Sequence, residues 1–294
     1  MLGTAVGDAL GRPVEGHRQV SESYLAEISV MPRSKGYSDD TALTIWLAES
    51  LLACDGFDGF DMAYRFAEGY SHEPYRGYGS NITNVFHQVL QGANWKRAAQ
   101  GQFGGEGSYG NGGAMRVAPV ALWEHGNLKE TARLARKTCE VTHTHPIGVE
   151  GAMIQAVAAH HALRNEIDRA ELLRDLKKLV KTEQVTEKLE TLERALELED
   201  DLYARLHLGN WVSADKSVLT SVYCFLVAPD FEETIIRAIR MGGDTDTIAA
   251  MAGALAGARH GLEAIPQIWR DVEGADHLME LADGMYQRVQ QRGT

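Results

Sequence analysis

Cysteine is scarce in this chain of 294 residues. Its three cysteines, Cys54, Cys139 and Cys224, are widely spaced, odd in number and set among apolar neighbours. That pattern excludes the disulfide framework of a small secreted domain, because such a framework needs cysteines in pairs. We expect three reduced, buried thiols in a cytoplasmic protein.

Positive charge and long apolar runs are also lacking. The chain has 29 Lys and Arg against 41 Asp and Glu, a formal net charge of −12. Such a chain does not offer the basic track that nucleic-acid phosphates or an anionic membrane surface attract. No apolar run reaches the ~20 residues that span a bilayer, and no basic-then-apolar segment resembles a signal peptide. We expect no direct nucleic-acid partner and no membrane partner.

The period-two alternation of half-buried β-strands is absent as well. Apolar residues instead recur three to four apart, as they do on the buried face of a helix. Hydrophobic residues make up 44% of the chain and aromatic residues 7%, which are ordinary values for a globular protein. The sequence therefore predicts an all-α fold, a single compact multi-helix domain over residues 1–294 with a dozen or so helices.

Charged residues dominate one stretch, at about residues 166–206. Its leucines fall on one face of two predicted helices, whose other faces are charged. These leucines are Leu172, Leu176 and Leu179 in the first helix, and Leu189, Leu192 and Leu196 in the second. The pattern predicts a peripheral helical hairpin, which is also a candidate surface for self-association. We expect a monomer or a weak homo-oligomer.

Small residues recur at helical spacing in two distant stretches. Between residues 245 and 261 they include Gly253 and Gly257, and near the N-terminus Gly3, Gly7 and Gly11 lie four apart. Residues on one face of a helix recur at this spacing, and a face without side chains lets another backbone approach closely. We expect these two helices to pack against each other.

Acidic and hydroxyl side chains stand at the start of two predicted helices. One start carries Ser38, Asp39, Asp40 and Thr41; the other carries Asp244, Thr245, Asp246 and Thr247 behind two glycines. Asp, Ser and Thr are ordinary N-cap residues, and the helix dipole favours negative charge there. One cap needs only one such residue, however, so the repeated pattern indicates a further role.

If the two starts converge, their carboxylates need countercharge, because like charges cannot share a pocket as anions. No run of Lys or Arg flanks either motif. Oxygen ligands without a Cys or His set suit hard cations such as Mg²⁺, Mn²⁺ or Ca²⁺, and this many carboxylates can hold two ions. Convergence across about 200 residues is a hypothesis at this point.

Two loops of unusual composition and a pair of histidines are further candidates for a functional site. The loop at 103–116 has six glycines in fourteen residues, so its NH groups can approach an anion. It lacks the Lys-Ser/Thr ending of a P-loop, and a plain turn explains it equally well. The loop at 72–81 is rich in Gly, Pro and Tyr. His143 and His145 make a poor zinc site without further partners, so we expect a structural or substrate-contacting role.

Four motifs together resemble those of the ADP-ribosylglycohydrolase family. They are SDDT at 38–41, GDTDT at 243–247, GDALGRPVE at 7–15 and YGNGGAMR at 109–116. The resemblance extends from residue 2 to about residue 270. It implies an all-α enzyme that binds two Mg²⁺ or Mn²⁺ ions. It also implies hydrolysis of the C1″ glycosidic linkage of ADP-ribose in ADP-ribosylated proteins or other ADP-ribose derivatives.

The resemblance also implies roles for individual residues. The implied catalytic residues are Glu15, Asp39 and Asp246, although Glu15 alone would suit a surface loop. The implied metal ligands are Ser38, Asp39, Asp40, Asp244, Asp246 and Thr247. The implied substrate contacts are Gly77, Tyr78, Gly79, Gly107, Ser108, Tyr109, Gly110, Asn111, Gly112, Gly113, Met115 and His143.

Two other functions and the choice of linkage stay open. One is a relative that binds ADP-ribose, or serves as structure, without catalysis. Another is an unrelated Mg²⁺-dependent phosphohydrolase. Such an enzyme would need a basic residue beside the metals, and Arg116 is the candidate. The two loops of unusual composition resemble the branch that acts on serine-linked ADP-ribose and on poly(ADP-ribose). The pair His145-Pro146 departs from that branch, so serine, arginine, O-acetyl-ADP-ribose and polymer linkages all remain.

Overall fold

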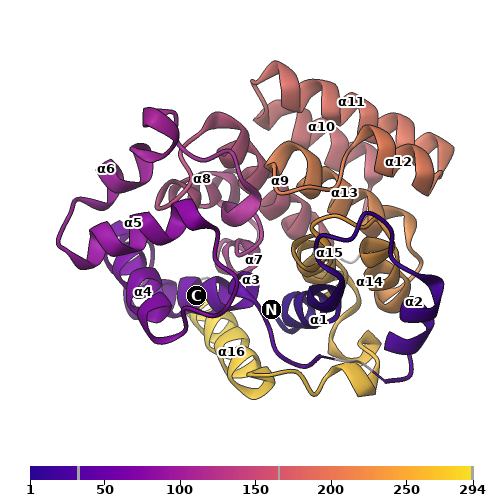
Figure 1. Cartoon of the computed structure of the whole chain (residues 1–294), viewed down its shortest axis with the longest axis horizontal. Helices are drawn as coiled ribbons and strands as arrows, with labels where there is room; N and C mark the ends of the chain where they lie inside the picture. The colour runs from indigo at the N-terminus through magenta and orange to yellow at the C-terminus, as the bar shows by residue number, and fades with distance from the viewer. Residues whose placement is uncertain (32–33, 165, 293–294) are drawn as a thin grey trace.

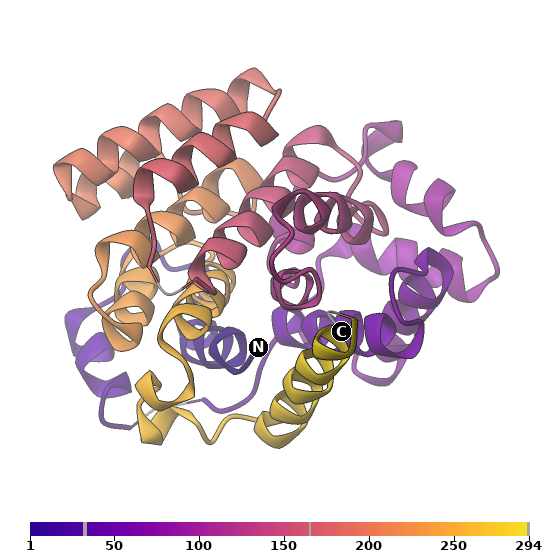
Figure 2. The ribbon, with the colours of Figure 1, turned by 180° about the vertical axis from the view of Figure 1, so that it is seen from behind.

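The computed structural model describes residues 1–31, 34–164 and 166–292. Sixteen α-helices and five short 3₁₀ helices form in these ranges, and no strand occurs in them. One isolated β-bridge joins Gly110 to Ser213. The predicted all-α fold, one compact body of many helices, is confirmed (Figures 1 and 2). No described helix combines the length and apolar character needed to cross a bilayer.

Two helices from opposite ends of the sequence lie side by side in the middle of the molecule (Figures 1 and 2). They are α1 (Leu2–Gly11), all of whose residues are buried, and α15 (Thr245–His260), which is buried as far as Ala256. Three further helices pack against α15: α9 (Pro146–Ala162), α13 (Ala214–Val227) and α14 (Phe231–Arg240).

The small residues predicted to let these two helices approach do so. A Cβ atom at Gly3, Gly7 or Gly11 would lie within 2.4 Å of a main-chain carbonyl oxygen of α15. Real Cβ atoms do not come so close, so only glycine fits at these positions. The expected packing of the N-terminal helix on α15 is confirmed.

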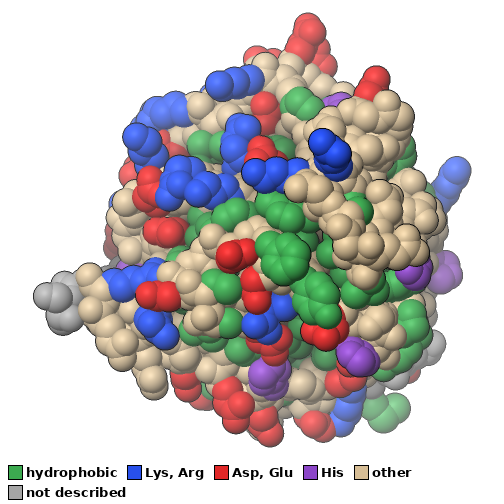
Figure 3. Space-filling model, turned by 90° about the vertical axis from the view of Figure 1, so that its left-hand side faces the viewer, with side chains coloured by type: hydrophobic (Ala, Val, Ile, Leu, Met, Phe, Trp, Pro, Cys, Tyr) green, Lys and Arg blue, Asp and Glu red, His purple; other side chains and the backbone are tan. Residues whose placement is uncertain are grey.

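The other helices form two flanks around this pair. One flank, which faces the viewer in Figure 3, carries α3 (Asp39–Ala53), α4 (Gly59–His72), α5 (Ser80–Leu90) and α6 (Trp95–Gln100). On the face that is turned to the viewer in Figure 2 lie α7 (Ala118–Trp123), α8 (Leu128–Glu140) and α16 (Ala275–Arg292). The opposite flank carries α2 (Glu22–Ile28), α10 (Arg169–Leu179), α11 (Glu183–Leu198) and α12 (Asp201–His207). The 3₁₀ helices are η1 (Arg12–Val14), η2 (Gln102–Gly105), η3 (Asn111–Gly113), η4 (Leu262–Ala264) and η5 (Gln267–Trp269).

The charged stretch at 166–206 folds as helices α10, α11 and α12. Its leucine face turns toward the rest of the chain, since α10 packs on α9 and α11 packs on α13. Five of the six leucines are buried there: Leu172, Leu176, Leu189, Leu192 and Leu196. The face is thus used within one chain, and self-association stays a prediction.

The expectation of three buried thiols is wrong for one of them. Cys139 and Cys224 are buried, but Cys54 is exposed. Cys54 follows Ala53, the last residue of α3, and caps the helix C-terminus. Of the apolar residues before it, Leu51 is buried, but Leu52 is only partly buried and Ala53 is exposed, so burial ends before the helix does.

Two glycines one turn apart on α15 give a matched test of the close packing. A Cβ atom at Gly253 would lie 2.2 Å from the carbonyl oxygen of Gly3, while a Cβ atom at Gly257 would meet nothing nearer than 3.5 Å. We expect Gly253→Ala to lower the free energy of unfolding by at least about 3 kcal/mol, because backbone on both sides cannot yield. Gly257→Ala should leave it unchanged or raise it by up to about 1 kcal/mol. Chemical denaturation of both variants is the measurement, and equal midpoints would contradict the packing.

Candidate active site

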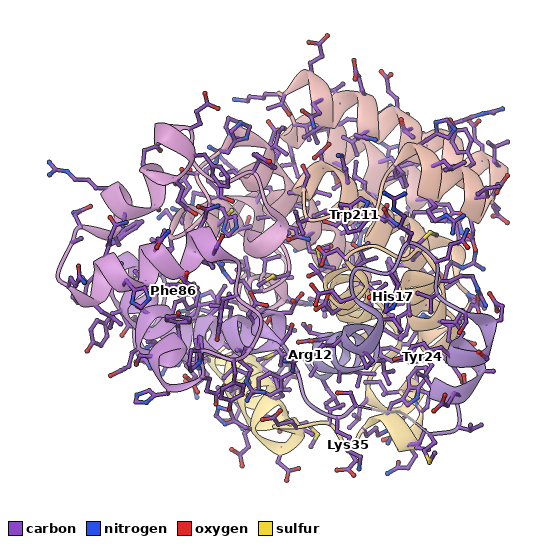
Figure 4. All side chains as sticks on the ribbon, in the orientation of Figure 1. Arg12, His17, Tyr24, Lys35, Phe86 and Trp211 are labelled. Carbon is purple, nitrogen blue, oxygen red and sulfur yellow. The ribbon has the colours of Figure 1, made fainter. Side chains whose placement is uncertain are left out.

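The starts of α3 and α15 open into one cavity of about 440 Å³. Ser38 is the N-cap residue of α3, and Asp244 is the N-cap residue of α15. The two starts touch directly, because Thr247 Oγ1 donates a hydrogen bond to Asp40 Oδ2 (3.3 Å). In Figure 4 the labelled Arg12, which also lines the cavity, lies near the centre of the molecule between its two flanks. The convergence assumed from the sequence is therefore present.

Glu15 joins the acids of α15. Its carboxylate lies with those of Asp244 and Asp246, so that one oxygen from each of the three lies within 4.8 Å of the other two. Asp244 and Asp246 are buried, but Glu15 is exposed. Two backbone hydrogen bonds hold this segment in place, from Gly16 N to Gly243 O and from Gly243 N to His17 O, both 2.8 Å.

A sixth acid, Asp8 on α1, lies behind the cavity and supports the start of α3. Both of its oxygens accept from the Ser38 NH at 2.9 Å, and Oδ2 also accepts from the NH (3.1 Å) and hydroxyl (2.6 Å) of Thr41. Asp8 is fully buried. It therefore fixes the start of α3 onto α1, a role that the sequence analysis missed although GDALG lies within a quoted motif.

The buried acids are electrostatically frustrated. Loss of water and the charge of Asp8 raise the pKa of Asp39 to about 8. Burial, together with neighbouring carboxylates, raises the pKa values of Asp40 and Asp246 well above the ordinary range. Asp40 Oδ1 is buried without a hydrogen-bond partner among the described residues. Such a cluster is stable as anions only with a positive charge among them.

The glycine loop forms the wall beside Asp244. Asn111 Nδ2 donates to Asp244 Oδ2 (2.6 Å) and to Ser217 Oγ (3.0 Å), so the loop is tied to the acids. Its backbone is held by the segment before α13, since Asn111 N donates to Val212 O (2.9 Å) and Ala214 N donates to Tyr109 O (3.1 Å).

His143 lies under this loop. Its ring is so close to Gly112 that a Cβ atom there would lie 2.6 Å from Cε1 of the ring. Burial, with the charge of Arg116 adding, lowers the pKa of His143 to about 3, so the ring is neutral. The Thr142 hydroxyl lies 2.8 Å from Nδ1, which leaves Nε2 for the cavity that His143 lines.

The loop at 72–81 is held by Arg76, whose guanidinium is buried. It pairs with Glu73 (2.8 Å) and Glu273 (2.7 Å) and stacks on the ring of Tyr37, 4.0 Å from its centroid. The carbonyl oxygen of Arg76 accepts from the NH of Asp39 (3.0 Å). The loop thus connects the start of α3 with the segment before α16.

The N-terminus of α5 faces the same cavity. No side chain caps this helix, and Gly79, Ser80 and Asn81 line the cavity. The first NH groups of a helix lack intrahelical partners and carry the positive end of its dipole. They can therefore receive an anion.

Most of the residues predicted from the sequence line the cavity. They are Glu15, Ser38, Asp39, Asp40, Gly77, Gly79, Ser108, Gly110, Asn111, Gly112, Met115, His143, Asp244, Asp246 and Thr247. Four do not: Tyr78, Gly107, Tyr109 and Gly113. The Tyr78 ring packs instead with Trp46, Tyr70 and Phe86. Lining residues that the sequence analysis missed are Arg12, Arg76, Ser80, Asn81, Ile82, Gln102, Phe103 and Val212.

Two residues weighed as functional candidates have structural contacts instead. Arg116 is fully buried and donates to Gly112 O (2.8 Å) and to the hydroxyl of Thr142 (2.7 Å). His145 is the N-cap residue of α9, where Nδ1 accepts from the NH of Ile147 (3.2 Å). Neither lines the cavity.

Comparison with known proteins agrees with this geometry. The family model described as ADP-ribosylglycohydrolase matches residues 1–294. The chain belongs to the ADP-ribosylglycohydrolase family. ADP-ribosylhydrolase ARH3 of Gallus gallus is 36% identical over 98% of this chain and 91% of its own length. ADP-ribosylhydrolase ARH3 of Homo sapiens is 35% identical over 99% of this chain and 92% of its own length.

The fold agrees with that of a solved family structure. A structure titled ADP-ribosylglycohydrolase-related protein complex superimposes with a TM-score of 0.78 and 28% sequence identity, covering 98% of this chain and 95% of that one. Family membership indicates an enzyme that hydrolyses ADP-ribose linkages, with ADP-ribose derivatives as substrates.

The contact between Gly112 and His143 generates a matched test on ADP-ribose binding. Gly112→Val would drive the His143 ring from its place, whereas a Cβ atom at Gly284, on α16 outside the cavity, would meet nothing nearer than 3.6 Å. We expect Gly112→Val to weaken ADP-ribose binding at least about tenfold, or 1.4 kcal/mol, and Gly284→Val to bind as the parent does. Titration calorimetry on both folded variants is the measurement. Unchanged affinity in Gly112→Val would reduce the loop to a plain turn.

Proposed function

We propose that this chain is a divalent-cation-dependent hydrolase of the C1″ glycosidic linkage of ADP-ribose. Its substrates would be ADP-ribose attached to protein side chains, to esters or to other ADP-ribose units. The observation that carries the proposal is the meeting of Glu15 with the two acid-rich helix starts in one cavity. The glycine loop and the N-terminus of α5 also line that cavity.

Two Mg²⁺ or Mn²⁺ ions are the proposed cofactors. The residues present fit them, since the buried acids lack countercharge and Asp40 Oδ1 lacks a hydrogen-bond partner among the described residues. Hard cations prefer such carboxylate and hydroxyl oxygens. The residues that would hold them are Ser38, Asp39, Asp40, Asp244, Asp246 and Thr247. When bound, the ions would supply Lewis-acid stabilisation of ribose oxygens and activation of water.

Glu15 is the proposed proton-transfer group. Cleavage at C1″ builds oxocarbenium character on the ribose and requires a water oxygen to add where the leaving oxygen departs. A carboxylate near that carbon can take the proton of the water and deliver one to the leaving group. Glu15 alone in its cluster is exposed, so it can exchange protons with solvent. Asp244 and Asp246 are buried beside it and suit a fixed role as ligands.

The diphosphate is proposed to lie between the glycine loop and α5. The uncapped N-terminus of α5 offers NH groups to an anion, and Gly110 and Gly112 offer backbone without side chains in the way. Farther along the cavity wall lies Phe103, and the ring of Tyr109, outside the cavity lining, is 5.7 Å from it, centroid to centroid. The Phe103 ring at this position offers a surface on which the adenine base can stack.

The structure bears on both alternative functions, the unrelated phosphohydrolase and the relative without catalysis. A phosphohydrolase would need Arg116 beside the metals, and that side chain is buried and bonded to backbone and hydroxyl groups. A silent relative would not need the five acids kept together at the cavity. We propose that the substrates are serine-linked ADP-ribose and poly(ADP-ribose), because the loops at 72–81 and 103–116 resemble those of the branch that acts on these linkages. Parallel assays of serine-linked, arginine-linked, O-acetyl and polymeric ADP-ribose test that choice.

Replacing Glu15 by Gln tests the catalytic proposal. Gln keeps the shape of the side chain and removes its basicity, and general acid–base groups contribute about 10²–10⁴-fold to rate. We expect Glu15→Gln to bind ADP-ribose nearly as the parent does and to hydrolyse at least about a hundredfold more slowly. Single-turnover release and a binding titration on the same preparation measure both. Near-normal release would return Glu15 to an ordinary loop position.

A comparison of helix caps tests the metal proposal. Asp244 and Asp58 are both N-cap residues, but Asp58 is exposed and caps α4 far from the cavity acids. We expect Mg²⁺ or Mn²⁺ to raise the melting temperature of the parent and of Asp58→Ala. Asp244→Ala should lose that rise together with hydrolysis, because it loses a proposed ligand. An unchanged metal-dependent rise in folded Asp244→Ala would count against the site.

A further inference from the structure

A second cavity adjoins the active-site cavity. It has a volume of about 320 Å³ and is lined by α5, α6 and η2. Three residues, Asn81, Gln102 and Phe103, line both cavities. The two spaces therefore meet at these side chains, and Figures 1 and 2 show α5 and α6 side by side on the outer edge of the molecule. We call this second space the carboxamide groove.

Neutral amides give the groove its character. Asn81, Asn84 and Gln88 on α5 and Gln91 at its C-cap occur three to four apart, and all four are exposed and line the groove. Residues at this spacing lie on one face of a helix. Each carboxamide both donates and accepts hydrogen bonds, which suits ribose hydroxyls, the edge of a base and phosphate oxygens.

The groove lies in a part of the chain without acidic residues. Residues 74–105 contain no Asp and no Glu, yet they include Arg76, Lys96 and Arg97, in a chain whose net charge is −12. No carboxylate of this segment would repel a polyanion. No Asp or Glu lines the groove, so its own walls do not repel an anionic ligand.

The junction of the two cavities is built on a strained residue. Phe103 has φ 51° and ψ 44°, left-handed values that are uncommon for a bulky side chain, and the residue is 46% exposed. Gln102 beside it is buried and donates to the carbonyl oxygens of Thr142 and Ala99. Strain of this kind persists where the surroundings hold it, and it concentrates at ligand sites. It presents the Phe103 ring to both spaces.

The place where the two cavities meet indicates which part of a larger ligand can enter the carboxamide groove. Under the proposed function, C1″ lies at the acids, the diphosphate lies by the glycine loop and α5, and the base lies at Phe103. A protein attached through C1″ leaves from the acid end. A ligand in the carboxamide groove must instead continue from the adenosine end. In poly(ADP-ribose) the next unit is attached at that end, on a hydroxyl of the adenosine ribose.

We propose that the carboxamide groove holds the next ADP-ribose unit of a polymer whose preceding unit occupies the active site. The enzyme would then engage an internal unit and cut within the chain. Water oxygen adds to C1″ of the bound unit, the bond from C1″ to the leaving ribose oxygen breaks, and that oxygen takes a proton. The released fragment carries the bound unit and every unit beyond it. This inference rests on the proposed function.

The test uses ADP-ribose oligomers of one defined length and follows the first products. The parent should release fragments of two or more units at early times. The double variant Asn84→Glu, Gln88→Glu places two carboxylates in the groove, and like charges brought together in this way cost several kcal/mol. We expect its yield of such fragments to fall at least about tenfold, while single units are still released from chain ends. The matched control, Gln287→Glu with Gln290→Glu on exposed positions of α16, adds the same charge elsewhere and should resemble the parent.

A binding measurement separates this inference from the proposed function. In the slow Glu15→Gln background, the two-unit ligand should bind at least about tenfold (1.4 kcal/mol) more tightly than ADP-ribose. The groove variant should lose that difference, and the control should keep it. If the parent hydrolyses no linkage but still binds the two-unit ligand more tightly than ADP-ribose, the groove is supported as a binding site and the proposed function is wrong. Early products of single units only, equal affinities, or weakened binding of an ADP-ribosylated peptide in place of the two-unit ligand would overturn the inference.

Discussion

The close approach of α1 and α15 is the constraint on which the other features of the site depend. Glycines at three successive turns of α1 meet carbonyl oxygens of α15 at distances that no side chain permits. Because the helices touch along their backbones, Asp246 at the start of α15 lines the cavity while Asp8 on α1 lies buried behind it and holds Ser38 and Thr41. Glu15 follows α1 by only a few residues, so the same contact brings it to the acids. The positions of the cavity acids therefore depend on backbone packing that begins at Gly3 and reaches Asp246 itself, beside Gly11.

The acids themselves oppose folding unless their charge is balanced. Burial and mutual repulsion raise the pKa values of Asp39, Asp40 and Asp246. Hydrogen bonds relieve Asp8, which accepts three donor groups, more than they relieve Asp40, whose Oδ1 has none among the described residues. This difference divides the acids into two kinds. Asp8 is satisfied by the protein and holds structure, while the acids nearer the cavity are left with capacity for a ligand.

The features that could be predicted from the sequence are those that a local, repeating pattern of residues encodes. Helical spacing gave the all-α fold, small residues gave the contact of α1 with α15, and acids with hydroxyls at two helix starts marked the cavity. It could not predict how loops present their side chains. Tyr78 and Gly79 are neighbours, yet the Tyr78 ring packs in the core while Gly79 lines the cavity. Phe103 gave no periodic signal, because its position depends on a left-handed backbone turn. Arg116 lies in a motif beside the glycines, but it supports the loop from inside.

Arg76 couples parts of the chain that are far apart in sequence. Its guanidinium pairs with Glu273 just before α16, and its carbonyl oxygen accepts the NH of Asp39 at the start of α3. Loss of the segment around residue 273 would strip a buried guanidinium of a partner, which costs far more than the loss of an exposed ion pair. The C-terminal segment and the start of α3 therefore open together rather than separately. In terms of amide hydrogen exchange, we expect the NH of Asp39 to belong to the same cooperative opening unit as residues near position 273, although the two lie more than 200 positions apart.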